Sequence, residues 1–136
     1  MTATKRLGIV DAFRVYGAKL KNFRWAVSSI ASDGTLVISC WSTHFTTPNK
    51  DTLRYSDSLN RWNDINPPGR ELLAEHITAA YRDKVQIRLV MAHLAKNDAP
   101  KKAEYFHVRQ DLVGLVSEFD GDLFTIDFQR LKESKV

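Results

Sequence analysis

Residues 112–129 have the sequence LVGLVSEFDGDLFTIDFQ, two β-type runs joined by an Asp-Gly dipeptide. In the second run Phe124, Ile126 and Phe128 occupy alternate positions, which is the period of a strand buried on one face. Asp-Gly favours a tight turn because both of its residues tolerate a positive φ. The stretch therefore predicts strands over 112–119 and 122–129, paired as an antiparallel hairpin.

A second hairpin is expected earlier in the chain, where Asp33-Gly34 separates the β-type runs 23–31 and 35–41. Both faces of the run 35–41 are largely apolar, which indicates an interior strand. Residues 85–94, rich in Val, Ile and Leu, predict a further strand, and residues 52–56 could form a short edge strand.

Two amphipathic helices are expected. The first, over residues 7–21, has an apolar stripe at helical spacing. The second begins at Asn66-Pro67-Pro68-Gly69, because asparagine is a good N-cap and proline suits the first helical turn. It should extend to about Asp83. The stripe residues are Ile9, Phe13, Tyr16 and Leu20 in the first helix, and Leu73, Ile77, Ala80 and Tyr81 in the second.

The 136 residues are expected to form a single domain, 1–136, with a frayed tail at 131–136. The order of elements predicts an α+β fold, a mostly antiparallel sheet of about five strands with two α-helices packed on it. Residues 42–68 have no long periodic pattern. A structureless loop of that length is unusual in a compact domain, so we expect this segment to be partly structured or functional.

The composition, 43% hydrophobic and 26% charged, is that of an ordinary globular protein. Cys40 is the single cysteine, so no intramolecular disulfide can form, and its apolar neighbours predict that it is buried. No apolar stretch approaches the roughly 20 residues of a membrane span, and the N-terminus does not resemble a signal peptide. We therefore expect a cytoplasmic protein with no membrane association.

Signatures of catalysis are absent from the sequence. It contains no phosphate-binding glycine loop, dinucleotide fingerprint or nucleophile elbow. The four histidines show no metal-ligand spacing, and the acidic residues of 118–127 are accounted for by a solvated hairpin. We predict no catalytic residues, no metal and no cofactor.

The charge is unevenly distributed along the chain. The net charge of +4 combines a basic segment 1–24 (+5), a second basic segment 84–109 (+4) and an acidic segment 110–128 (−5). Such segregation can produce a basic face that binds an anionic partner. Alternatively, the acidic hairpin could neighbour a basic segment within the same molecule, and the sequence leaves both explanations open.

Arginines adjacent to aromatic residues recur, as in Arg24-Trp25, Arg54-Tyr55 and Arg61-Trp62. Arginine beside an exposed aromatic ring can stack on bases while its guanidinium binds phosphate. These pairs and the basic segments favour a small non-catalytic module that binds an anionic partner, with DNA or RNA as the first candidate. The predicted contact residues are Arg24, Arg54, Arg61, Trp62, Lys101 and Lys102.

Two other functions are considered. A protein–protein interaction module, such as an inhibitor, an adaptor or a homodimer, could pair through an exposed edge strand at 122–129. A small metal-dependent nuclease or hydrolase could use the acidic hairpin and a histidine.

Overall fold

The computed structural model describes residues 7–22, 24–62, 66–94 and 103–131, and the side chains of Trp62, Leu94, Ala103 and Glu104 are not described. The predicted frayed tail lies outside these residues except for Leu131. The elements are α1 (Ile9–Val15), β1 (Ser28–Ile30), β2 (Leu36–Trp41), η1 (Ser42–His44), β3 (Phe45–Asn49), β4 (Thr52–Ser58), η2 (Leu59–Trp62), α2 (Pro67–Asp83), β5 (Ile87–Leu94), β6 (Ala103–Val108), β7 (Leu112–Phe119) and β8 (Leu123–Arg130).

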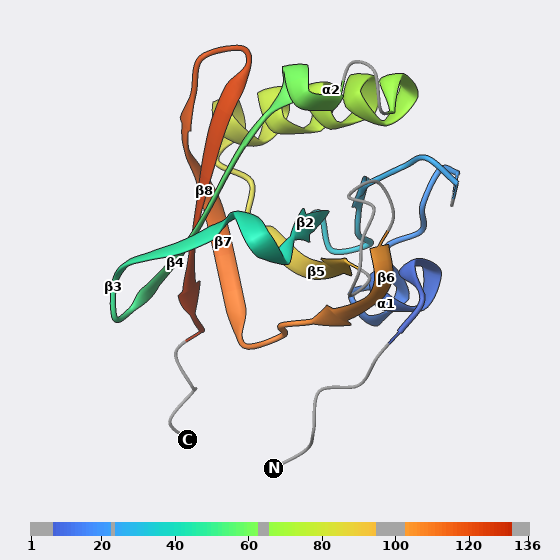
Figure 1. Cartoon of the computed structure of the whole chain (residues 1–136), viewed down its shortest axis with the longest axis horizontal. Coiled ribbons are helices and arrows are strands. Elements are labelled where there is room, and N and C mark those ends of the chain that lie inside the picture. Colours follow the sequence, from blue (N-terminus) through green and yellow to red (C-terminus); the bar gives the residue numbers. More distant parts are fainter. Residues whose placement is uncertain (1–6, 23, 63–65, 95–102, 132–136) are drawn as a thin grey trace.

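The fold is α+β, as predicted, with two α-helices and a mixed, mostly antiparallel sheet (Figure 1). Seven strands follow the order β1-β2-β5-β7-β8-β4-β3, and β6 pairs with β5. Strands β2 and β5 are parallel, and the other pairs are antiparallel. The sheet has eight strands rather than about five, partly because β3 is a mostly exposed edge strand without an apolar alternation.

Strand β5 joins the two halves of the sheet. One edge pairs with β2 along its length, from Leu36↔Ile87 to Trp41↔Ala92. The other edge is shared: β7 meets its start at Ile87↔Gly114, and β6 pairs with its second half. Residues 109–111 make the turn between these two partners, so β6 and β7 diverge from a common strand.

Two apolar clusters lie on opposite faces of β2. Leu36, Ile38 and Cys40 belong to the larger cluster, which contains α2 and the inner faces of β4, β7 and β8. Val37, which points to the other face of the strand, packs with α1. The two helices therefore cover opposite faces of the sheet, and Cys40 is fully buried as predicted.

The two predicted hairpins are confirmed. Gly34 and Gly121, in the two Asp-Gly turns, both have a positive φ, and the β7–β8 turn is reinforced by the Asp120 carboxylate, which accepts two backbone N–H bonds. Strand β8 is, however, interior: it pairs with β7 on one side and β4 on the other. The expectation that 122–129 forms an exposed edge is wrong, as is the expectation that 52–56 does, because the hairpin β3–β4 adds onto β8.

The first helix is shorter than predicted and ends at Val15. Gly17 adopts φ +78°, its N–H donates to Arg14 O, and the Ala18 N–H donates to Phe13 O, which is a Schellman termination. The first strand is also shorter and begins at Ser28, because the Trp25 and Ala26 N–H groups turn back to donate to Asn22 O.

The second helix matches its prediction, with the Asn66 carboxamide oxygen accepting from Gly69 N. Tyr81 departs from the predicted stripe: it is 45% exposed and its ring packs edge-on against Phe119.

Candidate functional site

The predicted contact residue Arg54 lies on β4 with its guanidinium held by Asp127 of β8. Its Nε donates to Oδ1 at 2.7 Å and its Nη2 donates to Oδ2 at 3.1 Å. This two-bond pairing raises the pKa of Arg54. Asp127 therefore offsets the charge of Arg54 and occupies one edge of its guanidinium, which weakens its attraction for a nucleic-acid phosphate.

Arg61 is held in the same way by a much more buried carboxylate, that of Asp57 at the end of β4. The Arg61 Nε and Nη2 donate to the two oxygens of Asp57 at 2.7 and 2.6 Å. The Asp57 side chain is 2% exposed, whereas that of Asp127 is 25% exposed. Arg61 therefore anchors η2 to the end of β4.

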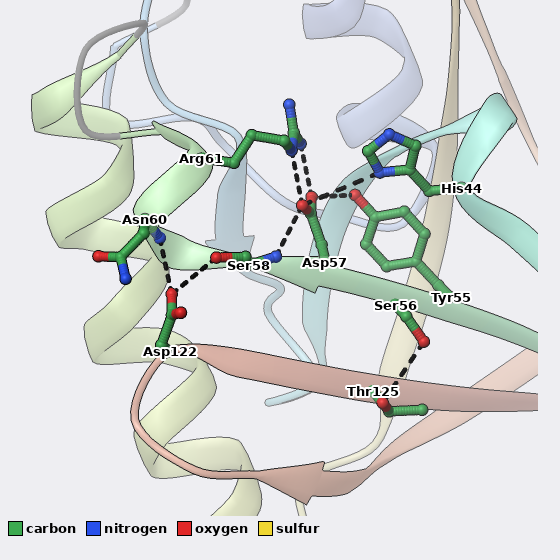
Figure 2. A network of polar contacts seen from close by, with 9 residues as sticks. All are labelled: His44, Tyr55, Ser56, Asp57, Ser58, Asn60, Arg61, Asp122 and Thr125. Carbon is green, nitrogen blue, oxygen red and sulfur yellow. Dashed lines mark hydrogen bonds and ion pairs between the residues drawn. The ribbon is translucent and has the colours of Figure 1, made fainter.

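Asp57 is the centre of a polar network at this corner of the sheet (Figure 2). Besides Arg61, Tyr55 Oη donates to Oδ2 at 2.6 Å and the Ser58 N–H donates to Oδ1 at 2.7 Å. The His44 Nδ1 lies 3.9 Å from Oδ1. Burial opposes ionisation, but the hydrogen bonds from Arg61 and Tyr55 outweigh it and hold the pKa of Asp57 below its usual value.

A second carboxylate closes the network from the β7–β8 turn. Asp122 Oδ1 accepts from Ser58 Oγ at 2.7 Å and from the Asn60 N–H at 2.8 Å. The arrangement ties the β4–η2 junction to the tip of the last hairpin (Figure 2). The acidic hairpin therefore neighbours a polar loop of the same chain, and its Asp122 carboxylate accepts hydrogen bonds from that loop.

The remaining predicted contact residues divide into two groups. Trp62 ends η2, and its side chain is among those not described. Lys101 and Lys102 lie outside the described residues. Arg24, in contrast, is an exposed residue beside a surface hollow.

We call this the basic hollow: a cavity of about 750 Å³ bordered by α1 and the chain that follows it. Four exposed basic side chains and several apolar ones line it. Its basic residues are Arg14, Lys19, Lys21 and Arg24, and its other lining residues are Val10, Gly17, Ala18, Leu20 and Asn22. No Asp or Glu of the described segments lines it.

The backbone around the basic hollow is fixed by the sharp reversal at Gly17. After the reversal, Ala18 forms a bridge with Ala31, and Ser29 Oγ donates to the Lys19 carbonyl at 2.7 Å. Leu20 packs into the smaller apolar cluster, so the alternate residues Lys19 and Lys21 remain exposed. The exposed cations are thus carried by a segment that the protein itself holds in place.

Three of the four basic residues of the hollow were not predicted as contact residues. The charge distribution along the sequence could have indicated them, because all four belong to the basic segment 1–24. Arginine–aromatic neighbours in the sequence directed the prediction instead toward Arg54 and Arg61, both of which hold carboxylates of their own chain.

A second hollow, of about 730 Å³, lies beside the β7–β8 turn and bears on the hydrolase hypothesis. Its lining includes His44, Asp57, Tyr81, Glu118 and Asp120. Within the described ranges, no group of three or more His, Cys, Asp or Glu side chains is arranged to hold a metal ion.

No helix among the described residues is long and apolar enough to cross a membrane. Comparison with protein-family models, with curated proteins and with solved structures found no match to this chain.

Proposed function

We propose that the protein is a non-catalytic binding module for an anionic partner, that this partner is nucleic acid, and that the basic hollow is the contact surface. The observation that supports this proposal most directly is the convergence of Arg14, Lys19, Lys21 and Arg24 around one hollow. Arg14 also makes a 3.3 Å ion pair with Asp11, but both side chains are more than half exposed, so exchange for a phosphate costs little.

The shape and chemistry of the hollow suit a phosphate backbone. Exposed lysine and arginine side chains neutralise phosphates and release condensed counterions, which supplies most of the affinity of such contacts. The apolar wall made by Val10, Ala18 and Leu20 offers a surface against which a sugar or base can pack. Because the proposed contacts are made to phosphates, which carry no sequence information, we expect affinity with little sequence preference.

The proposal is tested by fluorescence anisotropy with labelled single-stranded and duplex DNA and RNA across a series of salt concentrations. We expect binding at low salt that weakens linearly as the logarithm of the salt concentration rises. Absence of binding even at low salt would contradict the proposal. Light scattering would then show whether the protein instead forms a defined dimer.

Alanine substitution locates the surface. Lys21→Ala and Arg24→Ala should each weaken binding to all sequences and reduce the salt slope by about one. The matched control is Lys50→Ala, because Lys50 is an exposed lysine in the β3–β4 turn, at the opposite end of the strand order from β1. An equal loss of affinity in the control would mean that overall charge, not the hollow, determines binding.

A further inference from the structure

Two histidines far apart in the sequence meet at the β5–β6 pair. His93 Nε2 and His107 Nδ1 are 2.6 Å apart, and the two imidazole rings meet edge to edge, 23° from parallel and with centroids 4.5 Å apart. The Tyr105 ring stacks on His93, with the two ring centroids 4.6 Å apart and the ring planes within 9° of parallel. All three side chains are partly buried.

The chemistry of imidazole limits how many protons this contact can hold. A hydrogen bond between two ring nitrogens needs one N–H donor and one lone-pair acceptor, so one proton lies between the rings. Two neutral rings satisfy this requirement, and so do one neutral and one cationic ring. Two cationic rings do not, because both facing nitrogens then carry hydrogen and both rings carry positive charge.

The opposite face of β6 supports the basic hollow. Phe106 and Val108 pack into the apolar cluster of α1, and Phe106 also pairs through its backbone with Leu7, just before that helix. Val10 and Arg14 of α1 line the hollow. The position of β6 on β5 is therefore connected, through α1, to one wall of the candidate binding surface.

We propose that His93 and His107 form a proton-sharing clamp that holds β6 on β5 and opens when both rings become protonated. Opening loosens the support of α1 and thereby makes the basic hollow pH-sensitive. The effect on binding rests on the proposed function, whereas the clamp itself does not.

The surroundings of His107 also disfavour its protonated form. Burial lowers the pKa of His107, and the neighbouring His93 and Arg109 lower it further. Arg109 is itself paired with Asp111 through two bonds of 3.0 and 2.9 Å, and the titratable Tyr105 stacks on His93. His107 therefore binds its proton less readily in the folded protein than a free histidine, which titrates at about 6.5, so its contribution to the clamp is lost as the pH falls below that value.

The clamp is tested first by amide hydrogen exchange, corrected for intrinsic rates, at pH 7.5 and pH 5. Protection of the β6 amides should fall roughly tenfold relative to the β7–β8 amides, the change expected for about one pKa unit of linkage. His107→Gln, which can hydrogen-bond but does not titrate, should remove this pH dependence. The matched control is His76→Gln, because His76 is also partly buried, with a pKa lowered by burial, and is bonded to Ser28 away from β6.

Imidazole NMR titration of the unmodified protein gives a second, independent measurement. We expect the two rings to titrate in two coupled steps, with the second proton bound well below the first. Two independent single-site curves, or unchanged β6 protection at pH 5, would overturn the clamp. Neither readout uses nucleic acid, so failure of the clamp and failure of the proposed function are distinguishable.

Discussion

Replacing Asp57 with asparagine should lower the free energy of unfolding by about 2–4 kcal/mol, because a buried acceptor is lost while the Arg61 side chain left behind is 30% exposed. The Asp57 oxygens accept four hydrogen bonds: two from Arg61, one from Tyr55 Oη and one from the Ser58 N–H. An asparagine amide keeps a single acceptor oxygen. Its NH₂ group would face two donors and leave them unsatisfied inside the protein.

Urea unfolding followed by tryptophan fluorescence measures this cost, and the molecule contains a matched control. Asp127→Asn also removes a bidentate carboxylate–arginine pair that involves β4, here through Arg54 of that strand. This second pair is more exposed, with 41% of the Arg54 side chain and 25% of the Asp127 side chain accessible. We expect a loss of about 1 kcal/mol or less there. Similar losses for the two variants would show that burial does not determine the strength of these pairs.

The pH dependence of the free energy of unfolding should also reveal the stabilising contribution of the ionised Asp57 side chain. Its pKa is lower in the folded protein than in the unfolded chain, so its contribution is complete above the unfolded value of about 3.9 and disappears as the pH falls through the folded value. Acidification below about pH 4 should therefore destabilise the unmodified protein more steeply than the Asp57→Asn variant. Parallel curves would contradict this assignment.

Gly114→Ala is expected to destabilise the protein by about 1–3 kcal/mol, the usual cost of overpacking a filled core. A Cβ atom at Gly114 would lie 2.6 Å from Phe128 Cδ1, 2.8 Å from Phe128 Cε1 and 3.0 Å from Ile126 Cγ2. Phe128 is fully buried, so its ring cannot swing away into solvent. The clash exceeds the gain of up to about 1 kcal/mol that alanine normally brings by restricting the unfolded chain.

A double-mutant cycle makes the cause testable. Phe128→Leu should remove most of the clash, so the double variant should be more stable than the sum of the two single losses predicts. Gly8→Ala is the control, because nothing lies within 4 Å of the added carbon and the φ of −79° suits alanine. Simple additivity in the cycle would show that contact with Phe128 is not the reason for glycine at position 114.

The parts of the fold that were predicted correctly are those encoded by neighbouring residues. The Asp-Gly turns, the alternation of Phe124, Ile126 and Phe128, and the Asn66 cap each act within a few residues. The end of α1 was also local, at Gly17, but the apolar stripe that continues to Leu20 obscured it. Tyr16 and Leu20 do pack with α1, from outside the helix.

The pairings that were not predicted join residues far apart in the chain. Arg54 and Asp127 are 73 positions apart, and Ser58 and Asp122 are 64 positions apart. The His93–His107 contact depends on the register of β5 and β6, in which His93 lies opposite Tyr105. Sequence spacing carries no information on such registers, so the charges that are neutralised inside the molecule could not be separated from those that remain exposed.

The order of the strands has a consequence for the newly made chain. Strand β4 ends at Ser58, but its partner β8 begins at Leu123, about 65 residues later. At a synthesis rate of about 5–20 residues per second, the β3–β4 hairpin is made roughly 3–13 seconds before the strand that pairs with the open edge of β4. During each round of translation the chain therefore presents an incomplete sheet, and of the strands described in this sheet the last to be synthesised is the one that joins β4 to β7.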